Sequence, residues 1–222
     1  MTMYYNFAPD CCQMRVSKVK LHAMARLPRS FYTRPTRQLA QSLLGCRLVR
    51  RFQGQRLSGL IVETEAYIGE NDQACHARFG RTPRNEVMYG LPGVAYVYFT
   101  YGMHWMLNVV SEAEGFPAAV LIRALEPLEG TEIMERHRHT AVARELTSGP
   151  ARLCQALRID RAMNGVDLCD PAGDLWIENG RPVAARSILR GPRVGLFNTP
   201  EPWKSKPWRY WLKDNPYVSR GA

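Results

Sequence analysis

Residues 94–110, VAYVYFTYGMHWMLNVV, decide how this chain folds. Two runs rich in aromatic and β-branched residues, 94–99 and 105–110, surround a short segment that contains a glycine. Such runs, joined by so short a connection, predict an antiparallel β-hairpin. The tip carries Tyr101 beside Gly102, where turns normally carry Asn or Asp. The stretch therefore predicts a hairpin with a large aromatic side chain at its tip, which suits insertion between stacked bases.

The segments on both sides of this hairpin predict more strands and a few helices. The expected elements are a helix that ends at Gly45, strands at 46–52, 57–67 and 118–125, helices at about 127–139 and 151–157, and a β-like region that runs to the end. Strands and helices do not alternate as in a parallel βαβ sheet, so we expect a single compact α+β domain with a mostly antiparallel sheet and flanking helices. Residues 1–26 show no clear period and predict a tail before a folded domain at residues 27–222.

The composition is that of a globular protein with an excess of positive charge. The chain has 222 residues, 45% of them hydrophobic, and is long enough to bury a substantial core. No apolar run approaches the roughly 18 residues of a membrane span, so we expect no membrane segment. Lysine and arginine number 30 and aspartate and glutamate 20, a formal net charge of +10. This charge predicts a polyanionic partner, above all a nucleic acid.

Cysteine and glycine patterns give no sign of a metal or a cofactor. The six cysteines form no Cys-x-x-Cys pair, and their spacing matches neither a zinc ribbon nor a disulfide framework. Cys75 and His76 are adjacent, but the other histidines and cysteines supply no metal-ligand spacing around them. No glycine-rich phosphate loop and no Gly-x-Ser-x-Gly motif is present. We expect reduced thiols, no metal and no cofactor.

Two glutamates stand at alternate positions of the run at 57–67. Glu63, Glu65 and Tyr67 have the same parity, so a regular strand places all three on one face. Two interpretations follow: a polar strand face that meets solvent, or an acid–base carboxylate that lines a pocket. Carboxylates two residues apart lie roughly 7 Å from each other, which also suits a hydrolase with paired carboxylates.

Each of three further groups of residues has two interpretations, contact with a ligand or ordinary structure. The loop at 78–85 holds three arginines, which suit either phosphate contact or a solvated surface. Tyr96 and Tyr98 share one face of the hairpin and Asn108 lies on its returning strand, so they either pack together or face one flat ligand. Ser148 precedes a predicted helix, where free amides suit an anion or an ordinary cap.

A series of short motifs stands in order between residues 27 and 219. They are Val62-Glu63-Thr64-Glu65-Ala66-Tyr67, His76, Thr82-Pro83-Arg84-Asn85, Tyr96-Val97-Tyr98, Tyr101-Gly102-Met103, Asn108, Arg123-Ala124-Leu125-Glu126-Pro127, Ser148-Gly149-Pro150 and Arg193-Val194-Gly195. Each is short, but their ordered set resembles the alkyladenine (3-methyladenine) DNA glycosylase family. The resemblance implies a curved antiparallel sheet with a protruding hairpin, and an enzyme that flips a damaged purine out of the duplex and cleaves its N-glycosidic bond.

The resemblance also implies a role for individual residues. It makes Glu65 the general base that activates water, with Arg123 and the main-chain carbonyl of Val194 holding that water. The implied base pocket, in which Asn108 excludes normal guanine, consists of Tyr67, His76, Tyr98 and Asn108. Tyr101 would fill the gap that the flipped nucleotide leaves in the duplex. Contacts with DNA outside the pocket are expected from Thr82, Arg84, Met103, His104 and Ser148, although family members vary at the position of His104.

The implied activity is that of a monofunctional glycosylase in base excision repair. Its expected substrates are 3-methyladenine and 7-methylguanine, and further hypoxanthine or ethenoadenine, in double-stranded DNA. A glycosylase that also cuts the strand usually needs an amine nucleophile, and residues 21–203 contain no lysine. We therefore expect an abasic site as the product, and a monomeric enzyme of the bacterial cytoplasm that works on the nucleoid.

Two other classes of protein account for part of the pattern. A non-catalytic nucleic-acid-binding module explains the charge, the arginines and the aromatic hairpin, but it gains little from a carboxylate that faces a phosphate-rich ligand. A hydrolase of another ribosyl or glycosyl bond explains Glu63 and Glu65, but not the basic charge.

Overall fold

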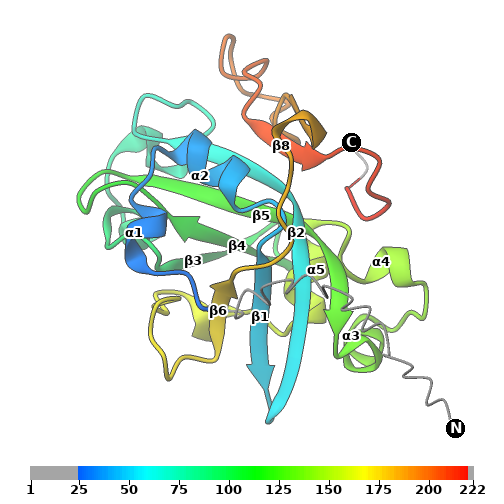
Figure 1. The fold of residues 1–222 in the computed structure, drawn as a ribbon. Helices are drawn as coiled ribbons and strands as arrows, with labels where there is room; N and C mark the ends of the chain where they lie inside the picture. The colour runs from blue at the N-terminus through cyan, green and yellow to red at the C-terminus, as the bar shows by residue number, and fades with distance from the viewer. Residues whose placement is uncertain (1–24, 220–222) are drawn as a thin grey trace, which may run out of the picture.

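Strand β2 (Gln55–Ile68) organises the sheet, and its neighbours change along its length (Figure 1). Strand β5 (Ala118–Glu129) pairs with it along one edge. On the other edge, β1 (Arg47–Phe52) pairs with its first half and β8 (Arg209–Leu212) with residues 63–65. Residues 57–66 are buried on both faces, which explains why hydrophobic side chains occur at both parities of this strand.

Every strand pairing in the computed structural model, which describes residues 25–219, is antiparallel. The strands form one open eight-stranded sheet with the order β3-β4-β5-β2-β1-β6, while β8 lies beside β2 and β7 beside β8. The remaining strands are β3 (Ala95–Thr100), β4 (His104–Val110), β6 (Leu175–Glu178) and β7 (Ile188–Gly191). The predicted α+β domain with a mostly antiparallel sheet is confirmed.

Helix α2 (Thr36–Ser42) determines which side of β2 carries the polar residues. Leu39 and Ala40 of this helix are fully buried in the main core, and the hydroxyl of Thr64 donates to the carbonyl of Ala40 at 2.8 Å. Successive side chains of a strand point to opposite faces. The residues before and after Thr64 therefore point away from α2, and this opposite side carries the site described below.

The other helices are short. They are α1 (Arg29–Tyr32), α3 (Thr131–Arg138), α4 (Ala143–Thr147), α5 (Pro150–Ala156) and four 3₁₀ turns at His76–Phe79, Glu86–Tyr89, Arg161–Met163 and Ala185–Ser187. Helices α3, α4 and α5 contact one another, and α5 packs on β4 and β5. A second, smaller hydrophobic cluster around Met88, Tyr96 and Val110 lies beside the site.

The predicted helix at 127–139 begins later than expected, because strand pairing continues through its first residues. Pro127 pairs with Gly59 and Glu129 with Ser58, with an irregular register at that point, and α3 begins only at Thr131. Gly130 makes the change of direction at a φ of 73°, and a Cβ atom there would lie 2.9 Å from a main-chain oxygen. Only glycine fits this connection without strain.

The predicted hairpin is present as β3 and β4, and the side chains at its tip are exposed. Tyr101 and Gly102 both have positive φ, 53° and 67°, as the tight turns of hairpins require. The side chains of Tyr101 and Met103 are 76% and 67% exposed. The turn therefore presents the tyrosine to solvent, although a tyrosine at positive φ is itself unfavourable.

The described residues begin at 25, and the first of them contact the sheet. Residues 1–24 of the predicted tail are outside them. The backbone of Arg26 forms an isolated antiparallel β-bridge with Glu178 of β6. Its guanidinium lies 4.6 Å from the centre of the Trp176 ring. The chain is thus attached to the sheet from this residue onward.

Candidate active site

A cavity of about 310 Å³ opens where the hairpin meets the centre of the sheet. Its walls come from strands β2 to β5 and from the loops at 74–76 and 194–196, which lie far apart in the sequence. The lining residues include Tyr67, His76, Tyr98, Tyr101, Asn108, Arg123 and Val194. All seven were predicted as pocket, catalytic or intercalating residues, so the fold brings these residues together.

The aromatic wall of the cavity is built around a neutral histidine. The rings of His76 and Tyr98 lie edge to face with their centres 4.4 Å apart, and Nδ1 of His76 lies 2.8 Å from the hydroxyl of Tyr96. Burial lowers the pKa of His76 to about 4, and the charges of Arg84 and Arg78 contribute to this decrease. The ring is therefore uncharged at neutral pH, and a cation in the cavity meets no repulsion from it.

Asn108 is held in place by the neighbouring strand. Its side-chain amide donates to the main-chain carbonyl of Tyr96 at 3.2 Å, across the register pair that these two residues form. The side chain is buried and lines the cavity. The bond to Tyr96 leaves the side-chain oxygen of Asn108 without a partner among the described residues. This oxygen can therefore accept a hydrogen bond from the edge of a flat ligand.

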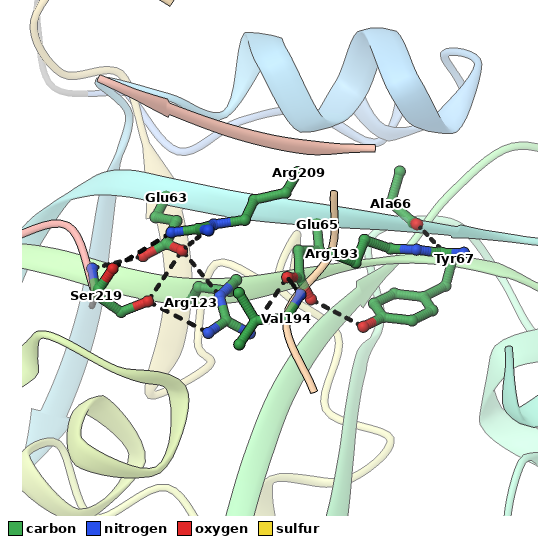
Figure 2. A network of polar contacts seen from close by, with 9 residues as sticks. All are labelled: Glu63, Glu65, Ala66, Tyr67, Arg123, Arg193, Val194, Arg209 and Ser219. Atoms are coloured by element: carbon green, nitrogen blue, oxygen red, sulfur yellow. Dashed lines mark hydrogen bonds and ion pairs between the residues drawn. The ribbon is translucent and has the colours of Figure 1, made fainter. Parts of the chain in front are cut away.

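Glu65 lies directly behind the lining of the cavity, fully buried. One carboxylate oxygen accepts a hydrogen bond from the amide of Val194 at 2.7 Å and lies 3.3 Å from Nη1 of Arg123. The other accepts from the hydroxyl of Tyr67 at 2.8 Å (Figure 2). Burial and the charge of Glu65 raise the pKa of Tyr67 well above its ordinary value, so this hydroxyl stays a donor. The three residues that contact Glu65 all line the cavity.

Glu63 is also buried, but its carboxylate is completely engaged in contacts with protein. It accepts hydrogen bonds from Arg123, Arg209 and Ser219, and it does not line the cavity. The interpretation in which these glutamates form a polar strand face in solvent is wrong, because both are 0% exposed. The two carboxylates share a face as predicted, yet Glu65 alone contacts residues of the cavity wall on both of its oxygens.

The loop that supplies Val194 is anchored by a buried ion pair. Arg193 binds both carboxylate oxygens of Asp72 at 2.5 and 2.8 Å and donates to the carbonyl of Ala66 at 2.9 Å. Its guanidinium lies close to the rings of Tyr67 and Trp208, 4.7 and 5.0 Å from their centres. Although burial alone lowers the pKa of Arg193, the bond to Asp72 raises it overall, so the guanidinium stays charged.

The residues predicted to contact DNA outside the pocket are more dispersed. Thr82 and Arg84 line a hollow that shares Tyr101 and His76 with the cavity. Ser148 lines another, which shares Arg123 with it. Met103 and His104 are exposed at the tip of the hairpin and line none of these hollows.

Several residues of the site carried no signal in the sequence. Met88, Met106, Leu121 and Leu196 also line the cavity, and Arg209 and Ser219 belong to the polar network around the buried glutamates. A strand-by-strand pattern cannot find them, because they come from different elements. Lys204, the first residue after the lysine-free stretch 21–203, lines a hollow together with Val194.

The part of the chain that the structure describes offers neither a metal site nor a spanning helix. Within residues 25–219, no group of three or more His, Cys, Asp or Glu side chains is placed to hold a metal ion. Among the described helices, none has the length and apolar character needed to cross a bilayer.

The sequence matches a known family over most of its length. Residues 30–216 match the model of the methylpurine-DNA glycosylase family. A protein of Methanocella arvoryzae is 52% identical over 200 residues, which cover 90% of this chain and 98% of that protein. A protein of Myxococcus xanthus is 50% identical over 195 residues, 88% of this chain and 94% of its own. Both carry the name of a 3-methyladenine DNA glycosylase, given provisionally. This chain therefore belongs to the methylpurine-DNA glycosylase family, whose members are hydrolases of N-glycosyl bonds in DNA.

Proposed function

We propose that this glycosylase removes alkylated purines, in particular 3-methyladenine and 7-methylguanine, from duplex DNA and leaves an abasic site. The observation that carries the proposal is the environment of Glu65. This carboxylate is shielded from solvent, yet it is bonded to Tyr67 and Val194 and lies beside Arg123, all three of which line the cavity. It thus lies directly behind the cavity wall, one hydrogen bond or ion-pair contact from three residues that would meet a nucleotide in the cavity.

The cavity suits a positively charged base. A purine alkylated at N3 or N7 carries a positive charge, and electron-rich rings attract a cation by about 1–2 kcal/mol per desolvated contact. Tyr67 and Tyr98 supply such rings, and His76 beside Tyr98 is neutral. Binding therefore favours the damaged base over a neutral one.

Glu65 has two roles in the proposed reaction. The bond between C1′ and the base nitrogen breaks with its electron pair going to the base, and a water oxygen bonds to C1′. Glu65 stabilises the oxocarbenium-like sugar and takes the proton of that water. A cationic base leaves as a neutral molecule, so no second acid is needed.

Hypoxanthine and ethenoadenine are neutral and require a proton as they leave. The described wall of the cavity holds no acid suited to donate it, because His76 is uncharged and burial raises the pKa of both Tyr96 and Tyr98. We therefore place these lesions among the slower substrates of the enzyme.

The proposed enzyme flips its target nucleotide and acts as a monomer on the nucleoid. Flipping costs a few kcal/mol, least for a badly paired lesion, and Tyr101 fills the resulting gap. The enzyme is also proposed to be monofunctional. Lys204 is the amine to test, since it shares a hollow with Val194. Borohydride should trap no protein–DNA adduct, and trapping that disappears in Lys204→Arg would show lyase chemistry instead.

The direct test is release of 3-methyladenine and 7-methylguanine from methylated duplex DNA without added metal. Wild type should release both, and Glu65→Gln should keep lesion binding while base release falls by about 10²- to 10⁴-fold. Glu114→Gln, at an exposed glutamate, is the matched control and should behave as wild type.

Two outcomes would contradict the proposal. Equal binding of damaged and undamaged duplex without base release would identify a binding module. Release from free nucleosides but not from DNA would identify another hydrolase.

A further inference from the structure

Strands β2 and β5 lose their regular register around Glu63, whose side chain binds Arg123. Ile61 pairs with Leu125 and Glu63 with Ala124, so the pairing is irregular on both sides of the glutamate. Irregular pairing of this kind redirects side chains. Thr64 pairs with Ile122, so the pairing skips Arg123. The side chain of Arg123 comes to lie between the two buried glutamates (Figure 2).

Each of the three guanidinium nitrogens of Arg123 has its own partner. Nε donates to Glu63 at 2.9 Å, Nη2 donates to the hydroxyl of Ser219 at 3.2 Å, and Nη1 lies 3.3 Å from Glu65. The guanidinium is planar and rigid. Fixing two of its nitrogens therefore fixes the direction of the third, which is the one that faces Glu65.

Glu63 and Ser219 form a closed unit behind the arginine. One oxygen of Glu63 accepts from the hydroxyl of Ser219 at 3.0 Å and from Nε of Arg209 at 2.6 Å. The other accepts from the main-chain amide of Ser219 at 2.7 Å. Arg209 also lies 3.3 Å from the carbonyl of Ser219. These hydrogen bonds and ion pairs offset the cost of removing the carboxylate of Glu63 from water.

Ser219 reaches this unit from beyond the last residue that the family model matches. The family model matches residues 30–216, and Ser219 follows β8 by seven residues, from Leu212 to Ser219. Nevertheless it is buried and contributes both its amide and its hydroxyl to Glu63. The contact with the site is therefore made by the segment that follows the matched region.

We propose that Glu63 and Ser219 are positioning residues of the glycosylase, which hold the guanidinium of Arg123 in the orientation that serves Glu65. The inference rests on the proposed function, because it assumes that Arg123 acts on the reacting nucleotide beside Glu65. Ser219 then supports the active site through Arg123, although it does not line the cavity.

A double-mutant cycle on the single-turnover rate of 3-methyladenine release tests this role in the full-length protein. Ser219→Ala should slow release about tenfold, since small misplacements of catalytic groups cost this much or more, while the Kd for lesion-containing duplex stays within twofold. Combined with Arg123→Ala, the same substitution should cost nothing further, because it acts through Arg123. A purely structural role would instead slow release by the same factor in both backgrounds.

Conservative variants and a matched serine complete the design. Ser219→Thr keeps the hydroxyl and should retain most of the rate. Ser205→Ala removes a hydroxyl from the same part of the chain, where it binds Glu201 away from this unit, and should behave as wild type. Glu63→Gln keeps the shape of the side chain and should also slow release without weakening binding, and it tests the unit independently of Ser219.

The outcomes separate the inference from the proposed function. A wild-type protein that releases no base overturns the proposed function. A wild type that needs Glu65 and Arg123 but tolerates Ser219→Ala and Glu63→Gln overturns the inference alone.

Discussion

His76 combines a fixed orientation with the absence of charge. Tyr96 binds its Nδ1, and burial among aromatic rings keeps it neutral. Buried neutral histidines make folding depend on pH, because the unfolded chain binds a proton that the folded chain excludes. The neutrality of His76, which favours the proposed binding of a cationic base, should therefore be visible in the pH dependence of the free energy of unfolding.

We predict that stability is lost as the pH falls from 6.5 towards 4. The folded pKa of His76 is about 4 against an ordinary value of 6.5, so in this window only the unfolded chain is protonated there. The effect reaches at most about 3 kcal/mol. His76→Gln should flatten the pH dependence of the urea midpoint between these values, whereas His104→Gln, at an exposed position, should not. An unchanged slope in His76→Gln would show that this histidine is not held neutral.

At the scale of elements, the turn of the β3–β4 hairpin holds Tyr101 in an exposed position. Its backbone has positive φ at Tyr101, which is costly for a residue with a side chain, and the ring is 76% exposed. Folding alone does not explain a strained, exposed tyrosine. The proposed insertion of Tyr101 into the DNA duplex would account for both features.

Tyr101→Ala should reduce base release from duplex DNA several-fold and leave release from single strands nearly unchanged, since a single strand leaves no gap to fill. Val142→Ala, at an exposed apolar position outside the hairpin and the cavity, is the control. The measurement is the single-turnover rate on the same methylated sequence in both forms. An equal loss on both forms would mean that Tyr101 does not act by insertion.

The connection between β5 and α3 gives a second prediction at this scale. Gly130 and Gly54 have similar φ values, 73° and 75°, but a Cβ atom meets a main-chain oxygen at 2.9 Å in Gly130 and nothing within 4 Å in Gly54. Gly54→Ala should cost about 1 kcal/mol of unfolding free energy for the backbone conformation. Gly130→Ala should cost at least about 1 kcal/mol more, because the overlap forces the strand and helix apart. Urea unfolding compares them, and equal costs would refute the steric argument.

At the scale of the whole molecule, a formal net charge of +10 favours a polyanion. The charges do not all contribute equally, because many arginines are paired with carboxylates. Arg81 binds Glu86 at 2.5 and 2.8 Å. Arg84 has no such partner within residues 25–219, and it lines the hollow beside Tyr101.

The salt dependence of duplex binding should separate these two arginines. Arg84→Gln should lower the slope of log K against log salt concentration by about 0.9, the value of one lost phosphate contact. Arg81→Gln should change the slope less, since Glu86 already compensates its charge. Binding isotherms at several salt concentrations check this, and identical slopes for both variants would place the phosphate backbone elsewhere.

Local patterns predicted the elements that carry most of the site. Alternation predicted that Glu63, Glu65 and Tyr67 share a face, and the aromatic runs predicted the hairpin; both hold because side-chain direction in a strand depends on local geometry alone. The helix expected at 127–139 was partly wrong for the opposite reason: β2 supplies pairing partners up to Glu129, and these outweigh local preference.

By itself, the sequence determined the class of fold, the positive charge and, through ordered motifs, the family. The tertiary structure decided that Glu65 contacts residues of the cavity wall with both of its oxygens, whereas Glu63 is enclosed by Arg123, Arg209 and Ser219. Glu63 and Glu65 are equivalent in strand position and chemistry. What distinguishes them is the neighbours that fold against each one, and these come from β5, β8 and the segment that follows it, at sequence distances over which no periodic pattern extends.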